Sequence, residues 1–414
     1  MSASSEARAI LEAKPARSIA GRSPSDRRLS YPYVILGAGC AGLSLAWNLV
    51  ELGVREPILL VDRREGFGND RTWCFWDVEP TPFSDLATHA WPRWRVNDGE
   101  SDVVSECPDY SYLRLRSGDV FRRIVDRLAL APNVSMALGR PILDVRESRR
   151  GVIVSTPGRE YVGERVFDSS GRASESPPPG RGARLLQHFL GQTIRADRPV
   201  FDLSCATLMD FRASQADGPH FVYVLPLSET EALVENTYLY PFDIDAERHR
   251  REVASYLRER FGLARDEYTV IEEEAGAIPM AVGQASRRDG SKVEPIGLCG
   301  GAARPSSGYA FLRIQRQARQ LAESIASGSD EPAEPASSLK YDLLDSIFLR
   351  VLADRPELAP RIFGRMFEGA EPAALVRFLS EKSTPVDDLR IVAALPKWPF
   401  IAAAARMAWA ARPA

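Results

Sequence analysis

A glycine-rich segment near the start of the chain constrains the fold more than any other feature. Gly37-Ala38-Gly39-Cys40-Ala41-Gly42 directly follows a short apolar stretch, YVIL, and precedes a helical pattern that runs through Leu52. In such a segment the first glycine permits a tight turn, the second lets a pyrophosphate approach the backbone, and the third lets helix and strand pack closely. The helix amino terminus adds unpaired N–H groups and partial positive charge. The pattern predicts a strand, turn and helix that bind a phosphate.

The next strand ends in an acidic residue at the position such a unit requires. The stretch PILLVD closes with Asp62, 25 residues after Gly37, near the spacing at which a carboxylate reaches a ribose hydroxyl. We therefore predict a dinucleotide-binding βαβ unit at residues 33–62. A glycine-rich turn without a ligand is the alternative, and the pattern alone does not separate NAD from FAD.

Two later segments favour FAD. Phe167-Asp168-Ser169-Ser170-Gly171 closes one strand, and Gly300-Gly301-Ala302-Ala303-Arg304-Pro305 closes another and opens a helix. The second places a further helix amino terminus where a flavin ring or its pyrophosphate could bind. Three such segments, near residues 37, 168 and 300, resemble the flavoprotein monooxygenase type of FAD fold. No second GxGxxG exists, so a dedicated nicotinamide domain is not expected.

The length and the order of elements predict an α/β protein with two interleaved lobes. A Rossmann-type FAD-binding domain is expected at 31–183 and 290–330, with parts of 70–115 lining a substrate cavity. Three strand-rich stretches predict a β-rich substrate domain at 184–289, entered through the Pro- and Gly-rich residues 173–183. A helical segment is expected at 337–414, and a disordered extension, rather than a transit peptide, at 1–30.

Composition excludes several classes of function. The formal charge of −3 argues against nucleic-acid binding. The five cysteines are scattered without a CxxC pair, which suggests neither disulfides nor a thiolate zinc site and fits a reducing cytoplasm. The four histidines show no HxxxH or HExxH spacing, so no metal is expected.

Residues 391–411 form the most apolar stretch of the chain. Lys397, Arg406 and two prolines interrupt it, and no uninterrupted apolar run reaches 18 residues. It is either a buried terminal helix or an amphipathic patch in which Trp398, Phe400 and Trp409 enter a membrane surface.

Several segments, taken in order, resemble the FAD-dependent lycopene cyclases, which make β-ionone rings on carotenoids. The resemblance covers about residues 32–403. It rests on RTWCFW (71–76), LMD (208–210), FVYVLPLS (221–228), LVENT (233–237), EAGAIPM (274–280) and RPSSGY (304–309). The resemblance places the last two of these segments around the flavin, with contacts at Arg304, Pro305 and Gly308. Arg304 could instead pair only with solvent.

One position departs from the family pattern. Bacterial members usually carry Glu-Asp-Thr, whereas this chain has Glu235-Asn236-Thr237. The replacement removes a negative charge next to Glu235 and puts a role for a carboxylate pair in doubt.

The resemblance implies an isomerisation without net redox change. A proton adds to the terminal alkene of a linear polyene, the cation is attacked by a nearby double bond, and a proton leaves. It assigns the acid to Glu235, which lies on an alternating apolar strand where burial would raise the carboxyl pKa. Asp210 could orient Glu235 across adjacent strands or could simply cap a turn.

The same reaction needs electron-rich surroundings for its cation. Aromatic faces supply about 0.5–2 kcal/mol each, and the candidates for the cavity are Trp73, Phe75, Trp76, Tyr223 and Tyr309. For each of these alone, core packing is the alternative. The resemblance also implies that FAD acts in its reduced form, with NADPH as electron source.

Two rival functions use the same scaffold. A flavin-dependent reductase or hydroxylase of isoprenoids would consume NADPH and change the mass of its substrate. A non-catalytic carotenoid-binding flavoprotein would convert nothing. Because a polyene dissolves in lipid, we expect a cytoplasmic protein in peripheral contact with a membrane. Whether β or ε rings form, and at one or both ends, stays open.

Overall fold

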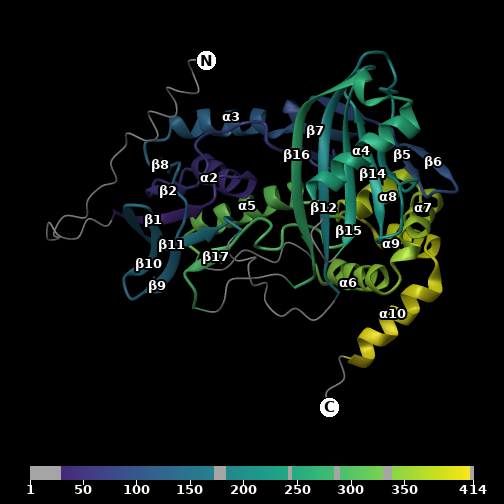
Figure 1. Cartoon of the computed structure of the whole chain (residues 1–414). Coiled ribbons are helices and arrows are strands. Elements are labelled where there is room, and N and C mark those ends of the chain that lie inside the picture. Colours follow the sequence, from purple (N-terminus) through teal and green to yellow (C-terminus); the bar gives the residue numbers. More distant parts are fainter. Residues whose placement is uncertain (1–28, 172–182, 241–244, 284–289, 330–337, 411–414) are drawn as a thin grey trace.

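The computed structural model describes residues 29–171, 183–240, 245–283, 290–329 and 338–410 (Figure 1). The expected extension at 1–30 lies outside the described residues except for Leu29 and Ser30, which begin the first strand. The expected crossing at 173–183 lies outside them except for its last residue. The described parts form a mixed α/β molecule with two large sheets, one small sheet and a layer of C-terminal helices.

The first sheet carries the predicted βαβ unit. Its order is β8-β2-β1-β11-β10-β9, with β17 also paired to β11. The strands are β1 (Leu29–Leu36), β2 (Ile58–Val61), β8 (Val134–Ala137), β9 (Asp144–Ser148), β10 (Gly151–Thr156), β11 (Arg159–Asp168) and β17 (Val293–Pro295). Strands β8, β2, β1, β11 and β17 run parallel. The four residues of β2 are all buried, as expected for a parallel strand covered on both faces.

Three helices cover one face of this sheet: α2 (Cys40–Glu51), α3 (Ser117–Ala129) and α5 (Phe311–Ala326). Alternate side chains of the strands point to opposite faces. Ile35 and Leu60 therefore join the core beneath the helices, whereas Leu36 and Val61 join a second core with residues of β10 and β11.

The second sheet is mostly antiparallel, in the order β16-β12-β15-β14-β13-β5-β6. Its strands are β5 (Arg93–Asn97), β6 (Asp102–Glu106), β12 (Leu185–Ala196), β13 (Ala206–Asp210), β14 (His220–Pro226), β15 (Glu231–Tyr240) and β16 (Tyr268–Met280). Strand β5 joins through parallel pairing with β13. Residues 93–106 thus lie in this sheet, although the sequence groups them with the nucleotide-binding part of the chain.

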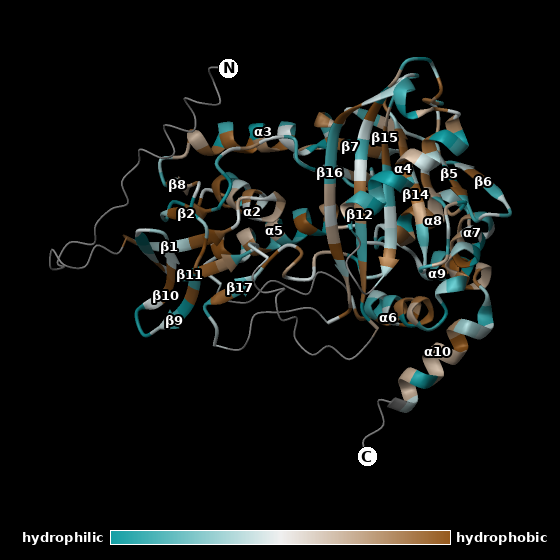
Figure 2. Cartoon of the chain, in the orientation of Figure 1, coloured by the Kyte–Doolittle hydropathy of each residue, from teal (hydrophilic) through white to brown (hydrophobic). Residues whose placement is uncertain are grey.

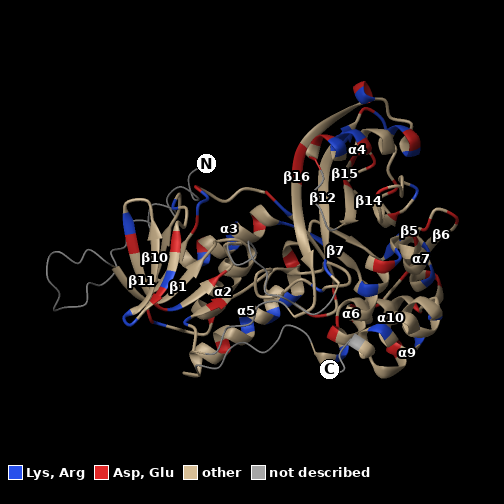
Figure 3. Ribbon diagram, turned by 60° about the horizontal axis from the view of Figure 1, so that its bottom comes forward, with Lys and Arg blue, Asp and Glu red and all other residues tan. Residues whose placement is uncertain are grey.

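Helix α4 (Ala246–Phe261) covers one face of the second sheet. It buries His249, Val253, Tyr256 and Leu257, a helical spacing that forms a single apolar stripe. Its remaining positions are highly charged, as Figure 3 shows. Gly262 ends the helix in the left-handed conformation, with φ of 61°. The opposite face of the sheet is therefore the one left for a cavity.

A small sheet, β3-β7-β4, lies between the two large sheets. Its strands are β3 (Thr72–Trp76), β4 (His89–Trp91) and β7 (Tyr112–Arg116). Its aromatic side chains reach both neighbours, because Trp73 packs on Phe121 of α3 while Trp76 packs on Trp94 of β5.

The C-terminal layer contains α6 (Leu339–Asp354), α7 (Ala359–Gly369), α8 (Pro372–Leu379), α9 (Pro385–Ala394) and α10 (Lys397–Ala410). Short 3₁₀ turns lie at Ser84–Leu86, Arg265–Glu267 and Pro356–Leu358. Helices α6 to α9 share a core with β5 and the second sheet. Helix α10 projects from this layer with a surface that mixes apolar and polar residues (Figure 2).

Of the two alternatives for residues 391–411, the buried terminal helix is wrong for α10. Trp398 is 82% exposed and Trp409 75% exposed, while Ala403 is buried. Among the described helices none alone has the length and hydropathy to cross a bilayer, and α9 and α10 meet those criteria only as a pair bent by 111°.

Candidate active site

The carboxyl ends of the parallel strands bring the three glycine-containing segments to one edge of the first sheet. Leu36 of β1 is level with Val61 of β2 and Asp168 of β11, and Asp168 is level with Pro295 of β17. The segments that follow these residues therefore meet at the same edge. In open parallel sheets this edge, where the chain direction of the crossovers changes, is where nucleotides bind.

The first and third glycines of the first segment have a steric reason for their identity. Gly37 has φ of +92°, and a Cβ there would lie 2.7 Å from the hydroxyl of Ser169. A Cβ on Gly42 would lie 1.9 Å from the carbonyl oxygen of Gly37. Gly39 instead faces open space, with its nearest neighbour, Arg64, at 3.9 Å. The backbone is thus closed at the first and third glycines and accessible at the second, which fits a pyrophosphate.

The start of α2 is also free to accept such a group. Gly39 is the N-cap residue, and no side chain caps the helix. The first N–H groups of a helix lack partners within it, so they are donors for phosphate oxygens.

Asp62 reaches this turn. Its carboxylate accepts hydrogen bonds from the backbone N–H groups of Ala38 at 2.5 Å and Arg64 at 2.7 Å. The side chain of Arg64 lies 3.3 Å away. Asp62 is 8% exposed and holds the glycine turn in place; its contact with a ribose stays a prediction.

The other two segments pack around the first. The carboxylate of Asp168 accepts from the N–H and hydroxyl of Ser170 at 2.8 and 2.6 Å. Gly171 follows with φ of +87° and open space around it. A Cβ on Gly300 would lie 2.4 Å from the carbonyl oxygen of Pro295, and Gly301 has φ of +74°. These glycines let the turns bend sharply at the nucleotide-binding edge.

The third segment continues to the second sheet. Gly308 has φ of +72°, and a Cβ there would lie 2.4 Å from Oε1 of Gln187 on β12. The turn between β17 and α5 therefore connects the nucleotide-binding edge with the cavity described below.

Arg304 of this turn contacts the C-terminal helices. Its guanidinium is 1% exposed, pairs with Asp345 of α6 at 3.2 Å and donates to the carbonyl of Phe378 in α8. It also lies over the rings of Tyr341 and Phe378, 5.1 and 4.8 Å from their centres. Neither sequence interpretation, a flavin contact or pairing with solvent, describes these contacts. Pro305 is buried beside it.

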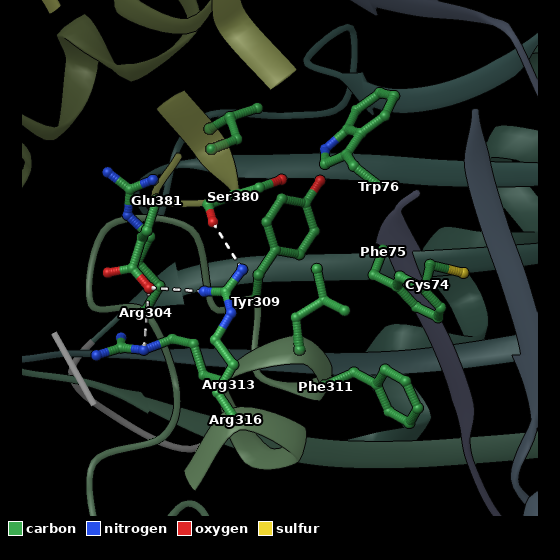
Figure 4. A pocket seen from close by; sticks show the side chains of 12 residues that line it. Cys74, Phe75, Trp76, Arg304, Tyr309, Phe311, Arg313, Arg316, Ser380 and Glu381 are labelled. Atoms are coloured by element: carbon green, nitrogen blue, oxygen red, sulfur yellow. Dashed lines mark hydrogen bonds and ion pairs between the residues drawn. The ribbon is translucent and has the colours of Figure 1, made fainter. Parts of the chain in front are cut away.

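A second connection runs through α5. Arg313 and Arg316 lie 3.4 and 3.7 Å from the carboxylate of Glu381, and Arg316 donates to the carbonyl of Ser380 at 3.1 Å (Figure 4). Among the described residues other than glycine, Glu381 alone has a positive φ, of 62°. The helices that roof the cavity are thus fixed to the turn and helix beside the nucleotide-binding edge.

The cavity has a volume of about 210 Å³ and lies between the second sheet, β3, the start of α5 and α7. Most of its walls are apolar or aromatic. Of the predicted residues, Trp73, Tyr223 and Tyr309 line it. The prediction missed further aromatic residues in its wall, namely Tyr112, Phe189, Phe221, Phe311, Phe363 and Phe367.

Phe75 and Trp76 line a small adjoining pocket of about 20 Å³ instead (Figure 4). Phe75 stacks on Phe311 with ring centres 4.8 Å apart. Trp76 is buried between Trp94 and Tyr112. Phe75 and Trp76 thus pack against Phe311 and Tyr112, which line the larger cavity.

Glu235 projects from β15 into the larger cavity. Burial raises the pKa of this carboxyl group to about 8, and the nearby Glu274 adds to the shift. The hydroxyl of Thr237, which donates to Glu235 at 3.3 Å, and the charge of Arg71 oppose it. The carboxyl group is therefore protonated at neutral pH.

Glu235 belongs to a row of residues that crosses four strands. Gly191 of β12 pairs with Glu235 on one side and with Glu274 of β16 on the other. Tyr223 of β14 pairs with Glu235 and donates to the hydroxyl of Tyr112 at 3.1 Å. Glu274 also lines the cavity, and burial raises the pKa of its carboxyl group. The sequence interpretation did not identify this second carboxyl group.

Asn236 and Asp210 lie on the opposite face of the sheet. Asn236 pairs with Val222, which pairs with Asp210. Asn236 bonds to His249 at 2.9 Å and to Glu252 at 2.8 Å on α4. Asp210 accepts from Tyr256 of α4 at 2.7 Å and from Arg212 at 2.8 Å. The Asn236 replacement therefore leaves the cavity unchanged, and Asp210 is not placed to orient Glu235.

Asp210 is a poor candidate for an acid as well, because its pKa is low. The hydrogen bonds from Arg212 and Tyr256 outweigh burial and lower the pKa of its carboxyl group. In the described part of the chain, no group of three or more His, Cys, Asp or Glu side chains is arranged to hold a metal ion.

Comparison with solved structures identifies the fold. The chain is similar to a geranylgeranyl bacteriochlorophyll reductase-like protein from Thermoplasma acidophilum, with a TM-score of 0.59 and 13% identity over 91% of this chain and 99% of that one. At this identity the likeness concerns the fold alone. A flavoprotein/dehydrogenase from Cytophaga hutchinsonii is similar to the same degree, with a TM-score of 0.59 and 14% identity over 92% of this chain and 100% of that one. The fold is therefore the predicted flavoprotein architecture.

Comparison of sequences identifies the family. Residues 33–405 match the model of the lycopene cyclase protein family. The chain is 28% identical to the lycopene beta-cyclase of Pseudescherichia vulneris, over 89% of this chain and 94% of that protein. It is 26% identical to that of Pantoea ananas, over 90% and 97%. Because the family model matches residues 33–405, the chain belongs to the lycopene cyclase family.

Proposed function

We propose that this protein closes β-ionone rings at the linear ψ-ends of a lycopene-type carotenoid, by an acid-initiated reaction without net redox change. The observation that carries the proposal is the environment of Glu235. Its carboxyl group lies in an apolar and aromatic cavity, beside the turn that leads from the nucleotide-binding edge, with a pKa raised to about 8.

Glu235 provides the proton in this proposal. An alkene is a very weak base, so its acid must be neutral, desolvated and in contact with the reacting carbon. Burial among Leu233, Leu239 and Phe221 supplies the desolvation. Transfer of the proton to the terminal double bond leaves a tertiary cation, and the next double bond of the chain attacks it to close the ring.

The walls stabilise the cation and exclude water. Aromatic faces attract a cation by about 0.5–2 kcal/mol each without reacting, and Trp73, Tyr223, Tyr309 and Phe311 line the cavity. Burial also raises the pKa of Tyr309 to about 12, so its hydroxyl stays neutral and weakly nucleophilic. Water would otherwise trap the cation as an alcohol.

The residues at the nucleotide-binding edge fit FAD. The open backbone at Gly39, the uncapped start of α2 and Asp62 at the end of β2 would hold its pyrophosphate and ribose. When bound in its reduced form, with NADPH as electron source, FAD supplies a negative charge that favours a cation nearby.

We also propose that the protein is cytoplasmic and binds a membrane surface through α9 and α10. Val386, Leu389 and Val392 of α9 and Trp398, Ile401 and Trp409 of α10 are all more than a third exposed. Exposed apolar residues on adjoining helices suit the boundary between the headgroups and the acyl chains of a bilayer, and an apolar polyene is dissolved among those acyl chains.

Expression in cells that accumulate lycopene tests the function. The extracted pigment should have the mass of lycopene and an absorbance shifted to shorter wavelength, since the ring double bond is twisted out of the plane of the polyene and conjugates less well with it. A product of changed mass, formed with matching NADPH consumption, would favour the reductase or hydroxylase. Unchanged lycopene beside FAD-loaded protein would favour a carotenoid-binding flavoprotein.

A further inference from the structure

The second carboxyl group of the cavity has no role in the proposal above. Glu274 and Glu235 lie on strands β16 and β15, which both pair with β12, and both are level with Gly191. Neighbouring strands are about 4.8 Å apart, so the two α-carbons are about 9–10 Å apart on the same face. Both side chains line the same cavity.

Gly191 leaves room between them. A Cβ at this position would lie 3.0 Å from Cδ1 of Leu233 and 3.3 Å from Oε2 of Glu235. The carboxyl group of Glu235 therefore leans over β12, into space that any other residue would narrow. The two carboxyl groups face a shared gap of the width of one strand.

The surroundings of the two groups differ. Glu274 has hydrogen bonds from Thr72 and faces the positive charges of Arg71 and Arg114, all of which oppose the effect of burial on its pKa. Glu235 faces Arg71, receives only the bond from Thr237, and is also next to Glu274. The same cavity is lined by further ionisable groups whose pKa values burial raises, namely Cys74, Tyr112, Tyr223 and Tyr309. Hydrogen bonds and positive charges thus favour the ionised form of Glu274 more than that of Glu235, although burial raises the pKa of both groups.

We propose that Glu274 is the base of the cyclisation, the group that takes the proton released when the ring double bond forms. This inference rests on the proposed function. The O–H bond of Glu235 breaks and a C–H bond forms at the terminal alkene carbon. After ring closure a C–H bond of the ring breaks, its electron pair becomes the ring double bond, and the proton binds the Glu274 carboxylate. Return of that proton to Glu235 across Gly191 restores both groups, so atoms and electrons balance.

The test compares the Glu274→Gln and Glu235→Gln variants with the wild type, each as full-length protein loaded with FAD and reduced. Lycopene in lipid vesicles is supplied in D₂O, and product and recovered substrate are weighed by mass spectrometry. Both variants should lose about 100-fold or more of the turnover. Only Glu274→Gln should put deuterium into recovered lycopene, because its cation forms and reverts, whereas Glu235→Gln cannot form it.

A matched control lies one position away on the same strand. Glu273 bonds to Arg250 and Gln192 at the surface, and Glu273→Gln should keep turnover within about twofold of the wild type. Bound flavin and melting temperature show that each variant is folded.

Three outcomes would overturn the inference. One is a Glu274→Gln variant with turnover near the wild type beside an inactive Glu235→Gln. Another is a Glu274→Gln variant that neither cyclises nor exchanges deuterium. The third is a Glu274→Gln variant whose turnover returns to the wild-type level at lower pH. That result would mean that Glu274 acts only through its charge, by setting the pKa of Glu235. A wild type that does not cyclise lycopene would instead overturn the proposed function.

Discussion

The two large sheets build their parts of the site in different ways. At the edge of the first sheet, the cofactor surface is backbone: turns that bend where glycine permits and N–H groups left open at the start of α2. On the second sheet the surface is side chains, and its chemistry comes from Glu235, Glu274 and Tyr223 in one row across the strands. The backbone surface is determined by the few residues of each turn, whereas the row of side chains forms only if the strands pair in the correct register. The two regions should therefore respond differently to substitution.

Glu235→Gln gives the largest effect and sharpens the contrast. It should lower turnover about 100- to 10,000-fold while bound FAD stays at the wild-type level, because the amide fills the same space but has no acidic proton. Product formation and flavin absorbance measure the two quantities. Glu231→Gln, on the same strand and paired with Arg195 at the surface, is the control. Loss of FAD in Glu235→Gln would mean that the two regions are not separate.

Asp345→Ala tests the connection between the regions. It leaves the Arg304 guanidinium buried without its counter-ion, which should lower the free energy of unfolding by about 3–5 kcal/mol. Denaturant melts measure the loss. Glu368→Ala breaks an ion pair with Arg365 in which both side chains are 56% exposed, and it should cost less than about 1 kcal/mol. Equal losses in the two variants would contradict the role given to Arg304.

Gly42→Ala tests the backbone surface. The new methyl group would collide with the Gly37 carbonyl oxygen. The backbone of the turn must shift to avoid this contact, at a cost of about 1–3 kcal/mol. The shift should weaken FAD binding about 10- to 100-fold. Titration of the apoprotein with FAD measures the affinity. Gly68→Ala, at a position with nothing within 4 Å, is the control and should bind FAD normally.

The pH profile tests the side-chain surface. Because the pKa of Glu235 is raised to about 8, its acid form persists at neutral pH, and turnover should fall about tenfold per pH unit above that value. The raised pKa also makes folding stability depend on pH. The stability that Glu235 contributes is fully present below pH 4.5, the pKa in the unfolded chain, and is lost as the pH rises through about 8, the pKa in the folded protein. Glu235→Gln should remove this slope from the pH dependence of the melting temperature. Turnover that stays constant to pH 10, about two units beyond that pKa, would exclude a carboxyl acid.

The smallest effect concerns the membrane. Trp398→Ser and Trp409→Ser should each weaken vesicle binding about fivefold, the equivalent of about 1 kcal/mol, and leave turnover on detergent-dispersed substrate unchanged. Flotation with phospholipid vesicles measures the binding. Serine at Leu130, which is 79% exposed at the end of α3, is the control. Binding that persists in both tryptophan variants would move the contact elsewhere.

The sequence predicted most of the first region because its signals are local. Gly37, Gly39, Gly42 and Asp62 lie within one strand–helix–strand unit, and their roles follow from backbone geometry. In the second region, resemblance to the family identified Glu235, and alternation along β15 predicted its burial. Glu274 was missed because residues 191, 235 and 274 become neighbours only through the register of three strands.

Two other features depend on contacts that the sequence leaves open. Strands β5 and β6 join the second sheet through a parallel pairing with residues more than a hundred positions away. Helix α10 is apolar in composition, but composition does not state which neighbours cover it, and the structure leaves Trp398 and Trp409 exposed.

The ion pair between Arg304 and Asp345 has a consequence for how the protein can be shortened or recombined. Of the C-terminal helices, α10 projects from the molecule in Figure 1, whereas α6 packs in the core and carries Asp345, the counter-ion of Arg304 in the turn between β17 and α5. A chimera that takes its C-terminal helices from a relative without a matching acid would bury the Arg304 guanidinium without a counter-ion, whereas a chain cut before α6 would lose the side chains that cover it. A redesign that replaces the C-terminal helices next to the cavity must therefore change Arg304 and Asp345 together.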